Sequence, residues 1–190
     1  MSKLLLLPGM PICSISSKGL FRRFSRFGTY TICFLGICIL MKLNVNAQTT
    51  VPTTLIKSIQ GKQTPFSELV KTEGDTAVVV SFWATWCIPC VSELDNISDE
   101  LADKQKEMPF KFYGVAVDDS RTANRVRSFV KGKGWKFEVY QDLNSELKRA
   151  LNITDIPHVL IIKNNQIVYR HTGYIAGEED NLFEEIKKLK

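Results

Sequence analysis

The sequence predicts an α/β fold in which helices cover a mixed β-sheet. Apolar runs of strand length alternate with segments of helical periodicity along most of the chain. After the last such run, Asn164-Asn165 forms a turn signal that leads into an antiparallel partner at 166–171. An apolar stripe then marks a closing helix. Strands that alternate with helices, followed by a hairpin and a helix, are typical of an α/β sandwich with a mixed sheet.

The first elements lie on either side of a tryptophan-rich segment. Residues 55–68 contain a Gly-Lys turn between short apolar runs, which predicts a small hairpin or an edge strand. Residues 76–82 (TAVVVSF) read as a buried central strand. From about residue 87 to residue 106, apolar positions recur at intervals of three and four, which predicts an amphipathic helix with Pro89 near its start.

The later elements continue the alternation. Residues 110–117 predict a second buried strand, and a second helix begins near Ala123 and ends near Gly132 and Gly134. A short strand at 136–140 and a short helix capped by Asn144 follow. The remaining elements are a strand at 159–162, its antiparallel partner, and a helix striped by Leu182, Phe183, Ile186 and Leu189.

The charge of the chain is concentrated at its amino terminus. The 190 residues carry a net charge of +5, but residues 1–47 hold six basic groups and no acidic one. The remainder holds 19 basic and 20 acidic groups, so the domain itself is nearly neutral. This distribution argues against nucleic acid as a partner, because nucleic-acid binding needs a basic surface on the folded domain.

Residues 1–47 have the three parts of a secretory signal peptide. A basic region precedes twelve apolar residues at 30–41, and Val45-Asn46-Ala47 forms a small-residue cleavage pattern. Twelve helical residues rise about 18 Å, short of the roughly 30 Å hydrocarbon core of a bilayer. We therefore expect a cleaved signal and a domain at 48–190, with an uncleaved membrane anchor as the alternative. The protein is then exported, to a periplasmic or other extracytoplasmic location.

Two of the five cysteines remain in the predicted domain, and they form the C-x-x-C pair Cys87 and Cys90. Two cysteines in the first turn of a helix can reach disulfide geometry. The helix N-terminus lowers the pKa of a thiol, so Cys87 is the expected nucleophile. Cys90, one turn further in, would resolve the mixed disulfide. We expect Trp83 and Trp86 to form an apolar rim around the pair.

Two other interpretations of the pair remain open. A C-x-x-C can supply half of a zinc site, but a closed site needs four ligands and the domain offers only His158 and His171 in addition. An inert structural pair is the other possibility. A C-x-x-C between a strand and a helix favours redox chemistry instead, and we expect neither a metal nor another cofactor.

The segment Phe82-Trp83-Ala84-Thr85-Trp86-Cys87-Ile88-Pro89-Cys90 resembles the active-site signature of thioredoxin-fold oxidoreductases, and the resemblance extends from residue 55 to residue 190. It is nearest to the exported TlpA/ResA-like members. The resemblance implies a thioredoxin-like three-layer sandwich with a central mixed sheet and flanking helices. It also implies that Glu93 belongs to the catalytic group, that the Ile156-Pro157 bond is cis, and that these two residues and Trp86 bind the partner protein.

The sequence departs from the thioredoxin pattern at several positions. Ser81 stands where thioredoxin has a buried aspartate, so we expect Glu93 to handle the proton of Cys90, directly or through water. The alternative for Glu93 is a solvated acid on the helix surface. Leu94-Asp95 replaces the usual apolar residue and proline, which suggests a helix without the family's kink. His158 touches a substrate, tunes a thiolate or is a plain exposed histidine.

Together these observations predict an exported thiol-disulfide oxidoreductase that reduces cysteine pairs of exported proteins. The resemblance further implies electrons from a membrane thiol-reducing donor, with apocytochrome c among the possible targets. A copper- or haem-handling thioredoxin-like chaperone that uses Cys87, Cys90 and His158 is the alternative. A thiol peroxidase is a third class, but the sequence shows no peroxidase nucleophile pattern.

Overall fold

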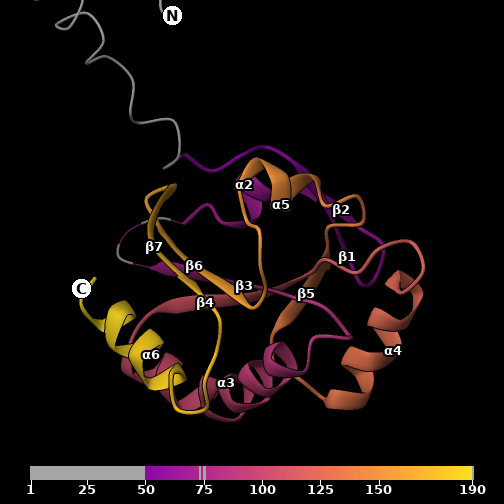
Figure 1. Ribbon diagram of the computed structural model, residues 1–190. Coiled ribbons are helices and arrows are strands. Elements are labelled where there is room, and N and C mark those ends of the chain that lie inside the picture. The colour runs from indigo at the N-terminus through magenta and orange to yellow at the C-terminus, as the bar shows by residue number, and fades with distance from the viewer. Residues whose placement is uncertain (1–49, 73, 75, 190) are drawn as a thin grey trace, which may run out of the picture. The chain divides into compact units, whose positions relative to one another are not determined.

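The computed structural model describes residues 50–72, 74 and 76–189. They form one seven-stranded sheet with helices on both faces (Figure 1). Three helices, α3, α4 and α6, cover one face, and the short helices α2 and α5 lie on the other. The predicted three-layer sandwich is therefore confirmed.

The elements alternate along the chain in the predicted way. The strands are β1 (Leu55–Ser58), β2 (Gln63–Pro65), β3 (Ala77–Trp83), β4 (Phe110–Ala116), β5 (Glu138–Gln141), β6 (His158–Lys163) and β7 (Gln166–Thr172). The helices are α2 (Phe66–Leu69), α3 (Ile88–Glu107), α4 (Ala123–Lys133), α5 (Glu146–Ala150) and α6 (Glu179–Lys187). No helix among these described residues is both long and apolar enough to cross a bilayer.

The sheet is mixed, with the order β2-β1-β5-β4-β3-β6-β7. Strands β3, β4 and β5 run parallel, whereas β6 is antiparallel to β3 and pairs with β7 through the Asn164-Asn165 turn. All seven residues of β3 are buried. A strand covered by helices on both faces needs apolar side chains on both sides, which explains its continuous valine run.

Register places three chain segments at one end of the sheet. Phe82, near the end of β3, pairs with His158, the first residue of β6, and His158 pairs with Thr172 at the end of β7. At the opposite end of the hairpin, Gln166 pairs with Lys163 and forms an isolated bridge with Thr50. The end of β3, where the C-x-x-C begins, is therefore remote from the point where the described chain starts.

One local expectation about the fold was wrong. Asn144 does not cap α5; the cap position is Ser145, and the buried carboxylate of Asp142 accepts the N–H groups of Leu147 (3.2 Å) and Lys148 (2.8 Å). The hairpin predicted within residues 55–68 is present as the antiparallel pair β1 and β2, and the short helix α2 follows it and buries Phe66. The predicted signal at residues 1–47 falls outside the described residues.

Candidate active site

The two cysteines lie at the junction of β3 and α3. Cys87 occupies the N-cap position of α3, and its carbonyl accepts the N–H of Val91 at 3.1 Å. Cys87 and Cys90 form a disulfide with their Cα atoms 5.3 Å apart. Pro89 stands in the first turn, where a helix needs no donor from it. The free N–H groups of this turn and the helix dipole would stabilise a thiolate at Cys87.

The two sulfur-bearing residues differ in exposure. Cys90 is fully buried, whereas Cys87 is 6% exposed and stands between two of the most exposed apolar side chains of the domain, Trp86 (62%) and Ile88 (82%). A partner protein therefore reaches Cys87 first. Exposed apolar side chains around a reactive atom are typical of a surface that contacts another protein.

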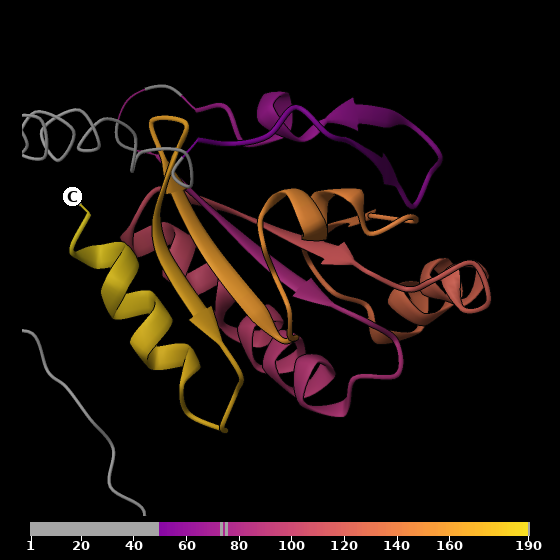
Figure 2. The same ribbon diagram turned by 45° about the horizontal axis from the view of Figure 1, so that its top comes forward.

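The cis-proline expected from the resemblance is present. The Ile156–Pro157 bond is cis, and Pro157 directly precedes His158, which pairs with Phe82 at the end of β3. Pro157 therefore lies at the same end of the sheet as the C-x-x-C. Its carbonyl accepts the N–H of Gly173 at 2.8 Å, which fixes this segment to the chain that follows β7. Figure 2 shows the hairpin of β6 and β7 beside β3 and above α3 and α6.

Glu93 is buried within the site. It lies one turn after Cys90 on the same side of α3, is 4% exposed, and its Oε2 accepts a hydrogen bond of 3.0 Å from the Ser81 hydroxyl. Burial raises the pKa of Glu93 from 4.5 to about 7; the Ser81 bond opposes this rise, and the charges of Glu179 and Glu178 add to it. The alternative of a solvated surface acid is therefore wrong.

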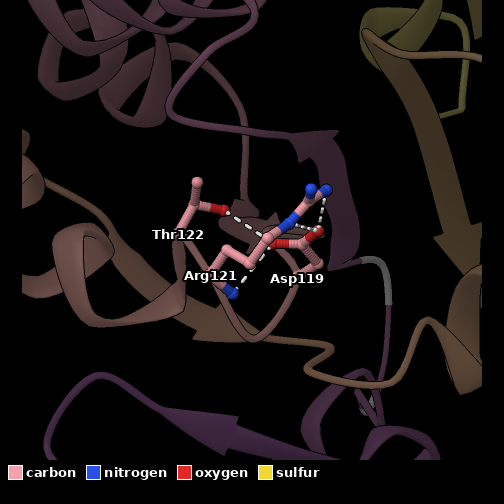
Figure 3. A network of polar contacts seen from close by, with 3 residues as sticks. All are labelled: Asp119, Arg121 and Thr122. Carbon is pink, nitrogen blue, oxygen red and sulfur yellow. Dashed lines mark hydrogen bonds and ion pairs between the residues drawn. The ribbon is translucent and has the colours of Figure 1, made fainter.

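The loop before the cysteines is held by a buried acid from the end of β4. Asp118 is 1% exposed, and its two carboxylate oxygens accept the N–H of Thr85 at 3.0 Å and the Thr85 hydroxyl at 2.5 Å. The adjacent Asp119 faces outward (Figure 3) and accepts hydrogen bonds from the side chains of Arg121 and Thr122. The turn after β4 thus has two roles. Asp118 fixes the active-site loop through Thr85, and Asp119 fixes the start of α4 through Thr122.

One expectation about the site's periphery was wrong. Trp83 is not part of an exposed rim: it is fully buried, and its ring packs edge-on against Trp135 with a centroid distance of 4.8 Å. Trp86, which was predicted to form the rim together with Trp83, is exposed as expected. Asp95, which replaces a family proline, accepts the Trp135 Nε1–H at 2.8 Å and so helps to fix the ring on which Trp83 packs.

His158 is not an exposed histidine either. It is 8% exposed, and its Nδ1 lies 2.7 Å from the Thr172 hydroxyl. Burial lowers the pKa of His158 from 6.5 to about 4, and the charges of Arg170 and His171 act in the same direction. The sequence could have indicated this burial, because His158 directly precedes an apolar run that forms a strand beside the central strand. No group of three or more His, Cys, Asp or Glu side chains within the described residues could hold a metal ion.

The fold, the C-x-x-C disulfide at a helix start and the opposing cis-proline define a thioredoxin-fold thiol-disulfide oxidoreductase. The chain belongs to the Redoxin family, whose model matches residues 47–186. It is similar to the thiol-disulfide oxidoreductase ResA of Bacillus thuringiensis subsp. konkukian, with 30% identity over 139 residues that span 73% of this chain and 75% of the relative. The enzyme is thus a thiol-disulfide oxidoreductase of the ResA type.

Solved structures agree with this assignment. The solution structure of an uncharacterized thioredoxin-like protein from Porphyromonas gingivalis is 36% identical, with a TM-score of 0.64, and the match covers 77% of this chain and 94% of that one. A secreted disulfide oxidoreductase of Mycobacterium tuberculosis matches with a TM-score of 0.57 and 18% identity over 72% of this chain and 96% of that one. The second likeness, at this identity, concerns the fold alone.

Proposed function

We propose that this enzyme reduces disulfides of exported proteins through a dithiol cycle of Cys87 and Cys90. The observation that carries the proposal is the asymmetry of the pair: Cys87 keeps 6% exposure at the helix start, between the exposed Trp86 and Ile88, whereas Cys90 is fully buried one turn before Glu93. A reactive thiolate that a partner can reach, backed by a protected resolving thiol, is the arrangement that disulfide exchange needs.

The cycle has two exchange steps. The Cys87 thiolate attacks one sulfur of the substrate disulfide, which forms a mixed disulfide and releases the first substrate thiolate. Cys90 then loses its proton to Glu93 and attacks the sulfur of Cys87. The bond between Cys87 and the substrate breaks, the second substrate thiolate leaves, and the Cys87–Cys90 disulfide forms. The substrate disulfide gains two electrons and the enzyme loses two.

The surface around Cys87 supplies the substrate contacts in this proposal. Trp86 offers an exposed apolar ring, while Ile156 is half-buried beside the cis bond. Ile156 and Pro157 bring an extended backbone segment opposite the cysteines, where a substrate strand can lie against them. The substrates are proteins with cysteine pairs, such as apocytochrome c, and a membrane thiol-reducing protein restores the dithiol.

Trapping of the mixed disulfide tests the exchange mechanism. In Cys90→Ala the first exchange still occurs, but no thiol resolves it, so the substrate stays bound through Cys87 and is released by dithiothreitol. Cys87→Ala, which keeps Cys90, is the matched control and should capture nothing. If Cys90→Ala captures no protein in the native compartment, the proposed cycle is wrong. A reduction potential above about −150 mV would contradict the reducing direction.

Export and the alternative function need separate measurements. The basic and apolar pattern of residues 1–47 supports an export signal, and cleavage after Ala47 would appear as a mature protein that begins at Gln48. The copper- or haem-handling alternative predicts stoichiometric Cu(I) binding that survives competition by glutathione, without reduction of insulin disulfides. Insulin reduction together with loss of Cu(I) to glutathione supports the oxidoreductase.

A further inference from the structure

A small cavity lies next to Glu93, between the sheet and the helices α3 and α6; apolar atoms form most of its lining, but carboxylate and imidazole groups also reach it. Its volume is about 70 Å³, enough for more than one water molecule. The cavity joins α3 to β7 and to the start of α6. Its lining residues are Glu93, Val159, Tyr169, His171, Glu178, Glu179, Asn181 and Leu182.

The cavity connects a buried acid with acids and a histidine that reach solvent. Glu93 is 4% exposed, whereas the side chains of His171 and Glu178 are 38% and 32% exposed. His171 Nε2 lies 3.6 Å from Glu178 Oε2 and is itself buried without a hydrogen-bond partner in the described part of the chain. A buried ring nitrogen that lacks a partner beside this cavity is a position where a water molecule can bind.

Other polar contacts make this wall of the cavity rigid. Glu179 accepts hydrogen bonds from the Tyr174 hydroxyl (2.8 Å) and from the side-chain amide of Asn96 on α3 (3.2 Å). Glu178 accepts the N–H of Ile175 at 2.7 Å. The start of α6 is thereby fastened to α3 and to the loop after β7, so the two acids keep their places relative to Glu93.

The proposed cycle requires a route for one proton. When Cys90 becomes a thiolate, its proton passes to Glu93, which can accept it only as a carboxylate. A protonated Glu93 must therefore first release its own proton to solvent before Cys90 can attack. Glu93 is surrounded by Cys90, Ser81 and the cavity, and its direct contact with solvent is small. On the sheet side of this region stands His158, whose ring is held by Thr172. The cavity is therefore a route from Glu93 towards solvent that avoids the substrate surface.

We propose that Glu93 exchanges its proton with solvent through water in this cavity, with His171 and Glu178 as the relay to the surface. The proton moves from the Glu93 carboxyl to cavity water, and from there to the His171 imidazole or the Glu178 carboxylate, which releases it to bulk water. No electron moves in this step. His171 and Glu178 touch neither substrate nor cysteine in this scheme, so they are positioning and relay residues rather than catalytic ones.

The charges around Glu93 favour the transfer in which Glu93 takes the proton of Cys90. Glu178, Glu179, Tyr169 and Tyr174 face the region from α6, β7 and the loop between them, and His171 and Arg170 belong to β7. The nearby acids favour a protonated Glu93. A proton acceptor with a pKa near neutrality both takes a thiol proton and returns it to water at useful rates.

The test isolates the step in which Cys90 attacks. The full-length reduced enzyme is mixed with the aromatic disulfide 5,5′-dithiobis(2-nitrobenzoate) in a stopped-flow instrument. Attack by Cys87 releases the first coloured thiolate at a rate that depends on reagent concentration. Attack by Cys90 on the mixed disulfide releases the second thiolate at a rate that is independent of reagent concentration. This experiment rests on the proposed function, and the first phase in the wild-type enzyme tests that function by itself.

In the double variant H171A/E178Q we expect the second phase to slow by about tenfold or more in dilute buffer, within the range that proton transfer contributes to enzymatic steps. Added imidazole at constant ionic strength should restore it, because a mobile base replaces the relay. The first phase should stay within about twofold of the wild-type rate. E184Q, which removes one exposed acid from the same helix, is the matched control and should behave as wild type.

Three results would overturn the relay. One is a second phase in H171A/E178Q that matches wild type in dilute buffer from about pH 5 to about pH 9. Another is slowing of both phases without rescue by imidazole, since that indicates structural damage. The third is an equal effect in E184Q, which would indicate a general effect of helix charge. If the wild-type enzyme lacks the first phase, the proposed function fails and the relay fails with it.

Discussion

Replacement of Glu93 by glutamine should change how the stability of the enzyme depends on pH. Glutamine has nearly the shape of the acid, and its side-chain oxygen can still accept the Ser81 hydroxyl, but it cannot ionise. In the wild-type enzyme the pKa of Glu93 is about 7 in the folded state against 4.5 without burial. Between these values the folded enzyme holds a proton that the unfolded chain has lost, so its stability falls as pH rises.

The size of this effect follows from the two pKa values. A shift of one pKa unit corresponds to about 1.4 kcal/mol, so the rise from 4.5 to about 7 removes about 3 kcal/mol of stability when the pH exceeds 7. The variant lacks this loss. The free energy of unfolding of E93Q, relative to that of wild type, should therefore increase by about 3 kcal/mol between pH 4.5 and a pH above 7.

Urea unfolding of the oxidised enzyme, followed by tryptophan fluorescence, measures the difference. Taking the difference between the two proteins removes contributions from groups that are the same in both, including His158, whose depressed pKa acts in the opposite direction. A difference that stays constant across this pH range, or that favours wild type as pH rises, would refute the assignment of Glu93 as a destabilising buried carboxylate.

Three further changes test other parts of the site. Asp118→Ala removes the acceptor of both Thr85 hydrogen bonds, so urea unfolding should show a loss of about 1–3 kcal/mol; an unchanged midpoint would contradict the anchoring role. Trp86→Ala should raise KM for insulin several-fold with kcat and Tm nearly unchanged, because the ring is 62% exposed; a fall in kcat alone would count against substrate contact. The free energy of unfolding of wild type, relative to that of His158→Asn, should rise from about pH 4 to 6.5, because burial lowers the pKa of His158; equal pH slopes in both proteins would show that His158 does not titrate there.

Local patterns in the sequence were sufficient to predict the fold class and the reactive pair. The valine run, the helical spacing after Cys90 and the Asn164-Asn165 turn each act within a few residues, and each predicted element is present. The signature around the cysteines implied both the thioredoxin-like arrangement and the cis bond before Pro157. Local signals are strong here because a buried strand and an amphipathic helix both require a continuous apolar pattern.

The remaining features depend on contacts between distant residues. Ser81 binds Glu93 across twelve positions, and Thr85 binds Asp118 across 33. Nothing near Asp118 in the sequence indicates that its carboxylate turns inward while that of Asp119 turns outward. The prediction that Trp83 lies in an exposed rim was wrong for the same reason, because the ring that buries it, Trp135, lies far along the chain. Such pairings are set by how the layers pack, which periodicity alone does not determine.

The bridge between Thr50 and Gln166 has a consequence for how the enzyme can be tethered. It brings the described chain into the domain at the end of the β6–β7 hairpin that holds Lys163, whereas the cysteines stand at the other end, beyond Phe82 and His158. A tether attached at Thr50 itself would therefore join the domain at the end opposite the cysteines and leave the surface around Trp86 and Cys87 free for a partner protein.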